Sequence, residues 1–153
     1  MKIYRPIVVL ATAISLVGCG DATYKDVSNE HNDLIGSDCT LLETLRAHGV
    51  SNAFGPEKKT DFVSIWNPGF RGSEVTFVMP LEAGTRMRVL AARECSNCPF
   101  DNLLEYHVQV VPEPDEFEGK PAFVRAESFL PHQVQCTVRP NNSFRPKPLR
   151  GSA

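Results

Sequence analysis

The sequence lacks the motifs that most nucleotide-binding and hydrolytic enzymes use. It has no glycine-rich phosphate-binding loop, and none of its serines lies in a G-x-S-x-G turn. No two of its 4 histidines have the i, i+4 spacing that holds a metal ion on a helix; they are His31, His48, His107 and His132. These absences argue against a hydrolase or a metalloenzyme, so we expect no catalytic residue, no metal and no cofactor.

An excess of basic residues is also missing. The chain of 153 residues has 16 lysines and arginines against 18 acidic residues, which gives a formal net charge of -2. Nucleic acids attract basic surfaces, so this balance argues against a nucleic-acid partner. The 42% of hydrophobic and 22% of charged residues are ordinary for a globular protein. The length suits one domain.

Long apolar runs are scarce, and the longest lies at the N-terminus. Lys2 and Arg5 precede an apolar run over residues 7–17, which is followed by Gly18 and Cys19. The run is shorter than the roughly 20 residues that a transmembrane helix needs. A charged start, an apolar middle and small residues at the end are typical of a secretory signal peptide. The sequence therefore predicts an exported protein.

The end of this signal, residues 16–19 (LVGC), resembles the lipobox of bacterial lipoproteins. In that family the signal peptide is cut before the cysteine, and the cysteine then carries acyl chains. The resemblance implies a signal peptide over residues 1–18, with lipidation and membrane attachment at Cys19. In that family an aspartate directly after the cysteine favours the inner membrane. Because Gly20 stands there, the resemblance favours the outer membrane, with the protein facing the periplasm.

Four further cysteines form an even set, which in an exported chain indicates a disulfide framework. We favour Cys39–Cys136, which would tie the ends of the domain together, with Cys95–Cys98 closing a local loop. The pairing Cys39–Cys95 with Cys98–Cys136 stays open. A four-cysteine zinc site is disfavoured because only one Cys-x-x-Cys is present. Redox chemistry at Cys95 and Cys98 is the alternative function, although no thioredoxin-like βαβ pattern surrounds them.

Composition divides the chain after the signal peptide into three segments. Residues 19–37 are mostly polar and predict a flexible tether. Residues 38–139 contain the apolar alternation and the paired cysteines, and they predict a single disulfide-stabilised domain. Residues 140–153 hold three prolines, three basic residues and no acid, which predicts a disordered basic tail.

The domain is predicted to be all-β, a small barrel or sandwich of about five to seven short strands. From residue 61 onward, apolar and polar residues alternate in short stretches separated by proline and glycine turns. Residues 38–50 are ambiguous. Their leucines fit one face of a helix that begins at Asp38 and ends at Gly49, so a short helix is slightly preferred to a strand.

Part of this β region is similar to bacterial SH3-like domains. Residues 81–90 (LEAGTRMRVL) are similar to the leucine-x-x-glycine-threonine-x-x-x-valine strand of that family. Residues 106–108 and 122–130 look like its paired strands and closing 3₁₀ turn, although Ala122 and Phe123 replace the usual glycine and tryptophan. The resemblance implies an SH3-like barrel that binds a peptide, a cell-wall component or a protein partner.

The candidate binding residues are Trp66, Asn67, Pro68 and Phe70. A tryptophan beside a Pro-Gly turn would lie at the mouth of a barrel, and tryptophan is enriched at binding hot spots. The alternative is that this single tryptophan packs in the core. We therefore expect a lipid-anchored envelope binding or accessory protein, with an envelope protein or peptidoglycan as partner; an immunity or inhibitor role belongs to this class.

Overall fold

The computed structural model describes residues 22–53, 55–98 and 103–137. The predicted signal peptide, the predicted lipidation site Cys19 and the predicted basic tail over residues 140–153 lie outside these residues. None of the helical turns in the described segments has the length and apolar character that crossing a membrane requires.

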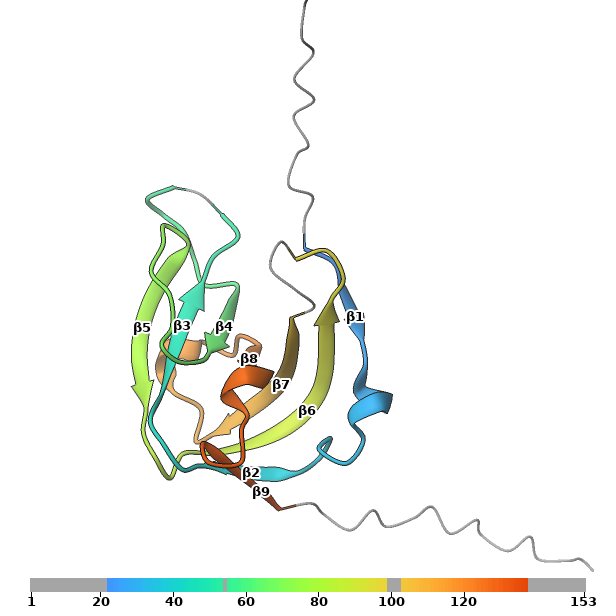
Figure 1. Ribbon diagram of the computed structural model, residues 1–153. Coiled ribbons are helices and arrows are strands. Elements are labelled where there is room, and N and C mark those ends of the chain that lie inside the picture. Colours follow the sequence, from blue (N-terminus) through green and yellow to red (C-terminus); the bar gives the residue numbers. More distant parts are fainter. Residues whose placement is uncertain (1–21, 54, 99–102, 138–153) are drawn as a thin grey trace, which may run out of the picture.

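In the described residues, nine strands form a single sheet in the order β5-β3-β4-β8-β7-β6-β2-β9, and β1 pairs with β6 beside this path. The sheet curves around one hydrophobic core (Figure 1). Strands β4 and β8 are parallel neighbours, and the other pairs are antiparallel. The strands are β1 (Tyr24–Asp26), β2 (Asp38–Leu41), β3 (Leu45–Val50), β4 (Phe62–Ile65), β5 (Val75–Leu81), β6 (Arg86–Cys95), β7 (Leu104–Val111), β8 (Ala122–Arg125) and β9 (Val134–Thr137), with 3₁₀ turns η1 (Ser28–His31), η2 (Asp115–Phe117) and η3 (Ala126–Ser128).

The all-β prediction is confirmed, with nine strands where the sequence predicted five to seven. Successive side chains of a strand point to opposite faces of the sheet, and the core is built from one of these two faces. In β4 the core side chains are Val63 and Ile65, and in β7 they are Tyr106, Val108 and Val110. The opposite face of the sheet is therefore available for polar and aromatic side chains.

The preferred helix over residues 38–50 is wrong, because the chain forms β2 and β3 there. Cys39 and Leu41 are buried, whereas Leu42 is 44% exposed, so the leucines do not share one face. β2 exchanges hydrogen bonds with β6 and β9, and β3 does so with β4 and β5. Pairing with distant strands decides the structure of this segment, and a local helical pattern does not reveal it.

The predicted tether is wrong for residues 22–37, which belong to the folded domain. β1 pairs with residues 93–95 of β6, and Val27 is only 3% exposed. The amide of Gly36 donates to the carbonyl of Val89 over 2.8 Å. These residues and β2 together cover one edge of the ten-residue strand β6, while β7 covers the other. Their polar composition reflects the exposed side of an edge segment.

The favoured disulfide pairing is confirmed. Cys39 and Cys136 face each other across β2 and β9 and are bonded, with a separation of 97 in the sequence. Cys95 and Cys98 form the second bond, across three positions at the end of β6. The first bond ties the end of the described domain to its early strands, and the second fixes one loop.

Candidate binding surface

The face of the sheet turned away from the core carries aromatic and basic side chains from neighbouring strands. Because Val63 and Ile65 of β4 point into the core, Phe62 points the other way. In β8, Ala122 and Val124 belong to the core, so the remaining side chains of that strand lie on the outer face. We call this surface the outer aromatic face; it comprises Tyr24, His48, Phe62, Trp66, Phe70, Arg93, Phe123 and Arg125.

One half of the outer aromatic face is organised by Arg93. Its guanidinium carbon lies 3.9 Å from the ring centre of Tyr24 and 3.3 Å from that of Phe123. The same guanidinium donates to Oε2 of Glu105 through Nε at 2.9 Å and Nη2 at 2.7 Å. Glu105 is only 3% exposed, so the charge of Arg93 is already matched by a buried carboxylate. Cation–π stacking and the ion pair together fix β1 against β6, β7 and β8.

The other half of the outer aromatic face is a stack of side chains. It includes Trp66 and Phe70, two of the binding residues predicted from the sequence. The guanidinium of Arg125 lies 3.8 Å from the ring centre of Trp66, which stacks on Phe70. Phe70 stacks in turn on His48 at 5.1 Å. Trp66 is half-buried on this face and is absent from the core, so the alternative of a core tryptophan is wrong.

His48 is the buried end of this stack. It is 1% exposed, and its Nδ1 lies 3.4 Å from the carbonyl oxygen of Ser64. Burial lowers the pKa of His48, and Arg46 and Arg125 lower it further, although hydrogen bonds to the backbone oppose them. The ring is therefore neutral at neutral pH and supports the turn that carries Phe70.

The turn over this histidine leads to a prediction about Gly69. Gly69 has φ of +82°, and a methyl group added there would overlap the ring of His48. Gly69→Ala should therefore lower the free energy of unfolding by about 2–4 kcal/mol, from backbone strain plus overpacking. Gly84, with φ of +91° and no atom near its added methyl group, is the matched control, and Gly84→Ala should cost about 1–2 kcal/mol. Urea denaturation measures both, and equal losses would contradict the overlap with His48.

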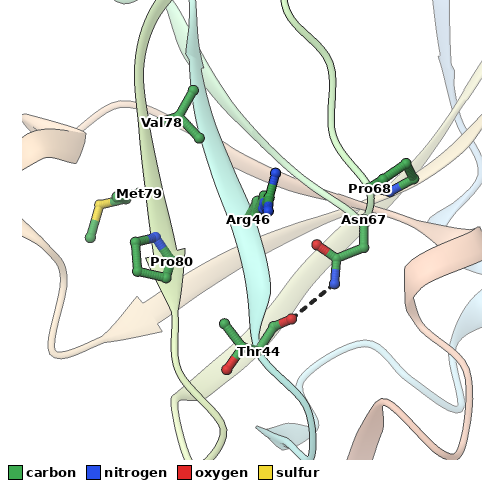
Figure 2. Close-up of a pocket in the computed structure, with 7 residues that line it drawn as sticks. All are labelled: Thr44, Arg46, Asn67, Pro68, Val78, Met79 and Pro80. Carbon is green, nitrogen blue, oxygen red and sulfur yellow. Dashed lines mark hydrogen bonds between the residues drawn. The ribbon is translucent and has the colours of Figure 1, made fainter.

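The structure brings Asn67 and Pro68 into a hollow between the start of β3 and the end of β5. Figure 2 shows the hollow, in which the Asn67 amide donates to the carbonyl of Thr44 over 2.9 Å. Its volume is about 770 Å³. We call it the β3–β5 hollow; it is lined by Thr44, Arg46, Asn67, Pro68, Val78, Met79 and Pro80.

Sequence reasoning found Asn67 and Pro68 but missed the residues of β3 and β5 in this hollow. Arg46 stands opposite Pro80 in the pairing of the two strands, and His48 stands opposite Val78. Alternation within residues 45–50 would have placed Arg46 on the outer face if the segment had been interpreted as a strand. Trp66 and Phe70 belong to the neighbouring stack and do not line the hollow.

A second hollow lies at the opposite end of β3. We call it the β1–β4 groove, because Tyr24 of β1 and Phe62 of β4 line it together with Arg93 and Phe123. Its volume is about 920 Å³, and Val50 at the end of β3 contributes to its wall. In Figure 1 the end of β3, the start of β4 and the start of β1 all lie toward the upper end of the domain. The two hollows therefore occupy opposite ends of one surface.

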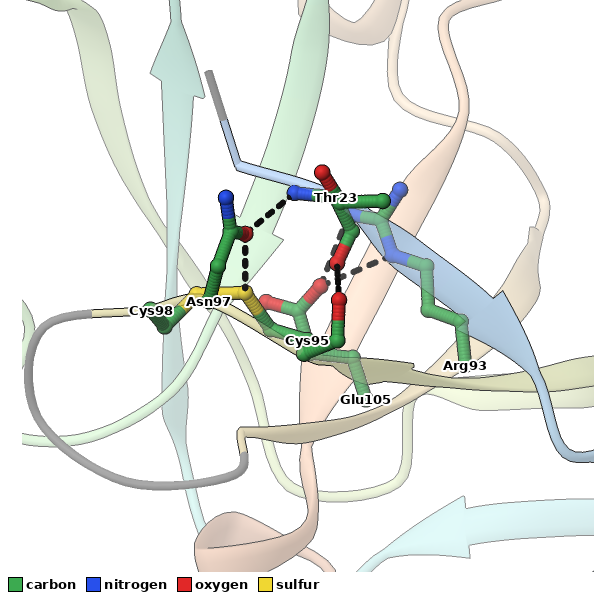
Figure 3. Close-up of a disulfide and its surroundings, with 7 residues drawn as sticks. Thr23, Arg93, Cys95, Asn97, Cys98 and Glu105 are labelled. Carbon is green, nitrogen blue, oxygen red and sulfur yellow. Dashed lines mark hydrogen bonds and ion pairs between the residues drawn. A yellow bond between two sulfur atoms is a disulfide. The ribbon is translucent and has the colours of Figure 1, made fainter. Parts of the chain in front are cut away.

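The geometry around Cys95 and Cys98 supports a structural role more than the redox alternative. Cys95 is fully buried and bonded to Cys98, whereas thiol–disulfide catalysis needs an accessible thiolate. Figure 3 shows the loop holding Thr23, whose amide donates to Oδ1 of Asn97 over 2.6 Å. The amide and hydroxyl of Ser96 both donate to the carbonyl of Thr23, over 2.9 and 3.1 Å. The disulfide thus shapes a loop that fixes the start of β1.

Within the described residues, no group of three or more histidines, cysteines and acidic residues is arranged to hold a metal ion. No protein-family model, curated protein or solved structure matches the chain.

Proposed function

We propose that this chain is a lipid-anchored binding or accessory protein of a bacterial cell envelope, and that its β3–β5 hollow binds another envelope protein. The resemblance of residues 16–19 to a lipobox supports an anchor at Cys19, with the outer membrane favoured by Gly20. The two disulfides support an exported protein, because disulfides persist in oxidising compartments. Peptidoglycan is the second candidate partner, and an immunity or inhibitor role is one form of such binding.

The observation that carries the proposal is an exposed arginine beside exposed apolar side chains. Arg46 forms no salt bridge with a described residue, and Val78 in the same hollow is 51% exposed. Arginine is one of the residue types enriched at binding hot spots. The volume of about 770 Å³ lies within the range of roughly 300–1,000 Å³ found for ligand sites. Such a site fits a carboxylate next to an apolar side chain, which acidic protein loops and peptidoglycan stem peptides both offer.

The test is photo-cross-linking in cells that express the full chain. A photoreactive residue at Val78 should give an adduct, because this side chain lies in the hollow and is exposed. Leu130, which is 41% exposed and lies outside the hollow, is the matched control position. A protein partner gives a discrete band of higher mass, whereas peptidoglycan gives an adduct that sediments with the cell wall.

The expected result is an adduct at Val78 that is absent at Leu130 and is lost when Arg46→Ala is added. The chain should fractionate with the outer membrane, and Cys19→Ala should leave the precursor unprocessed and without lipid. Equal adducts at Val78 and Leu130, or none at Val78, would rule out the hollow as the binding site. Normal acylation of the Cys19→Ala variant would rule out the anchor.

A further inference from the structure

The start of the described chain is fixed firmly to the domain. Thr23 is hydrogen-bonded through both its amide and its carbonyl to the loop closed by Cys95 and Cys98 (Figure 3). The next residues form β1, and Tyr24 stacks on Arg93. The described chain is therefore part of the fold from Thr23 onward.

This start leaves a short distance to the predicted anchor. Cys19 precedes Thr23 by four positions, and an extended chain advances by at most about 3.3–3.6 Å per residue. An acylated Cys19 would thus lie within about 14 Å of Thr23, about half the thickness of the roughly 30 Å hydrocarbon core. A linker of this length keeps the end of the domain that carries Thr23 at the bilayer surface.

The β1–β4 groove occupies that same end. Ala22 and Tyr24 line it directly, and Val50, Phe62 and Phe123 supply further apolar surface. Tyr24 is 37% exposed, and a tyrosine ring with an apolar body and a polar tip suits the interface between lipid and water. The guanidinium of Arg93 in the groove is already paired with Glu105.

The two acidic residues of the groove come from the segments that precede β4 and β5, and none comes from β1. Asp61 precedes β4 and accepts a hydrogen bond from the amide of Asn52 over 2.7 Å. Glu74 precedes β5, where its carbonyl accepts from the amide of Ser51. The groove residues nearest to the linker along the chain are thus Ala22 and Tyr24, and neither is charged.

We propose that the β1–β4 groove rests against the lipid bilayer that holds the anchor, with Tyr24 and Phe62 in contact with lipid. The inference rests on the proposed function, since it requires an acylated Cys19. It also orients the domain. Arg46 and Val50 lie at opposite ends of β3, so the β3–β5 hollow faces away from the bilayer and toward partners in the periplasm.

The test uses the full lipidated chain in phosphatidylcholine vesicles with or without brominated acyl chains, which quench nearby tryptophan fluorescence. Trp66, the one tryptophan of the chain, is first replaced by phenylalanine. Tyr24→Trp in that background then reports on the groove, and Val78→Trp reports on the hollow as the matched control. If Trp66→Phe prevents folding, the same two substitutions are made in the wild-type background. The quenching of the wild-type protein, which comes from Trp66, is then subtracted from that of each variant.

We expect Tyr24→Trp to lose about half of its fluorescence in brominated vesicles and Val78→Trp to change little, because aromatic side chains at the interface lie within reach of the acyl chains. A flexible Gly/Ser insertion of about 12 residues between Asp21 and Ala22 should abolish the quenching without releasing the protein from the vesicles.

Two results would overturn the inference, and they are distinguishable. In the first, the chain floats with the vesicles, but Tyr24→Trp is unquenched or is quenched no more than Val78→Trp. The anchor is then present, and the groove does not contact the bilayer. A chain that does not float with the vesicles has no lipid anchor, and both the inference and the proposed function then fail.

Discussion

Replacement of both Cys39 and Cys136 by alanine is expected to lower the free energy of unfolding by about 3–5 kcal/mol. The bond closes a loop with a sequence separation of 97, so its removal returns much conformational freedom to the unfolded chain. The folded state also depends on it, because β9 is hydrogen-bonded only to β2 among the described strands. Urea denaturation of the oxidised proteins at neutral pH measures the loss, which is large against a typical stability of roughly 5–15 kcal/mol.

The second disulfide supplies the matched control. Cys95 and Cys98 are separated by only three positions, so replacing both by alanine should cost about 2 kcal/mol on the loop-entropy estimate. The variant should also loosen Thr23, which the same loop holds, so its amide should exchange hydrogen faster than in the wild type. Equal losses of stability for the two double variants would contradict the loop-length argument.

Strands with a regular alternation of apolar and polar residues could be predicted from the sequence. The prediction failed for segments whose structure depends on pairing with strands far away in the sequence. The inward positions of β7 follow from the pattern of residues 105–111 alone, and the structure confirms them. The regular alternation of residues 86–90 ends at Leu90, but β6 continues to Cys95. The register shifts between Val89 and Ala91, which breaks the alternation and leaves Leu90 41% exposed. Because a bulge of this kind shifts the alternation, the second half of the strand cannot be recognised from the spacing of its apolar residues.

Only the part of the outer aromatic face next to the Pro-Gly turn could be predicted from the sequence. Proline and glycine beside Trp66 signalled a turn with aromatic neighbours, and that turn lies on the outer aromatic face. The pairing of Arg93 with Glu105 left no such signal. The two residues are 12 positions apart and meet because β6 and β7 pair in a register that places them opposite each other. Sequence periodicity gives the face of a strand but not its register against a neighbour.

The ion pair between Arg93 and Glu105 leads to the second prediction with a large expected effect. Arg93→Met should lower the free energy of unfolding by about 3–5 kcal/mol, because it leaves a buried carboxylate without its partner. The side chain of Glu105 is only 4% exposed, so water cannot replace the lost guanidinium. Tyr24 and Phe123 also lose the planar cation that lies between them. Denaturation of purified protein at neutral pH gives the value.

A double-mutant cycle separates the charge from the packing. Glu105→Gln removes the buried charge and leaves Arg93, whose side chain is 24% exposed and can reach water, so its cost should be smaller. Adding Glu105→Gln to Arg93→Met should then recover part of the stability, with a coupling energy of about 1–3 kcal/mol. Simple additivity of the two losses would show that the two side chains do not act as a pair. In that case, packing of Arg93 against Tyr24 and Phe123 would account for its effect.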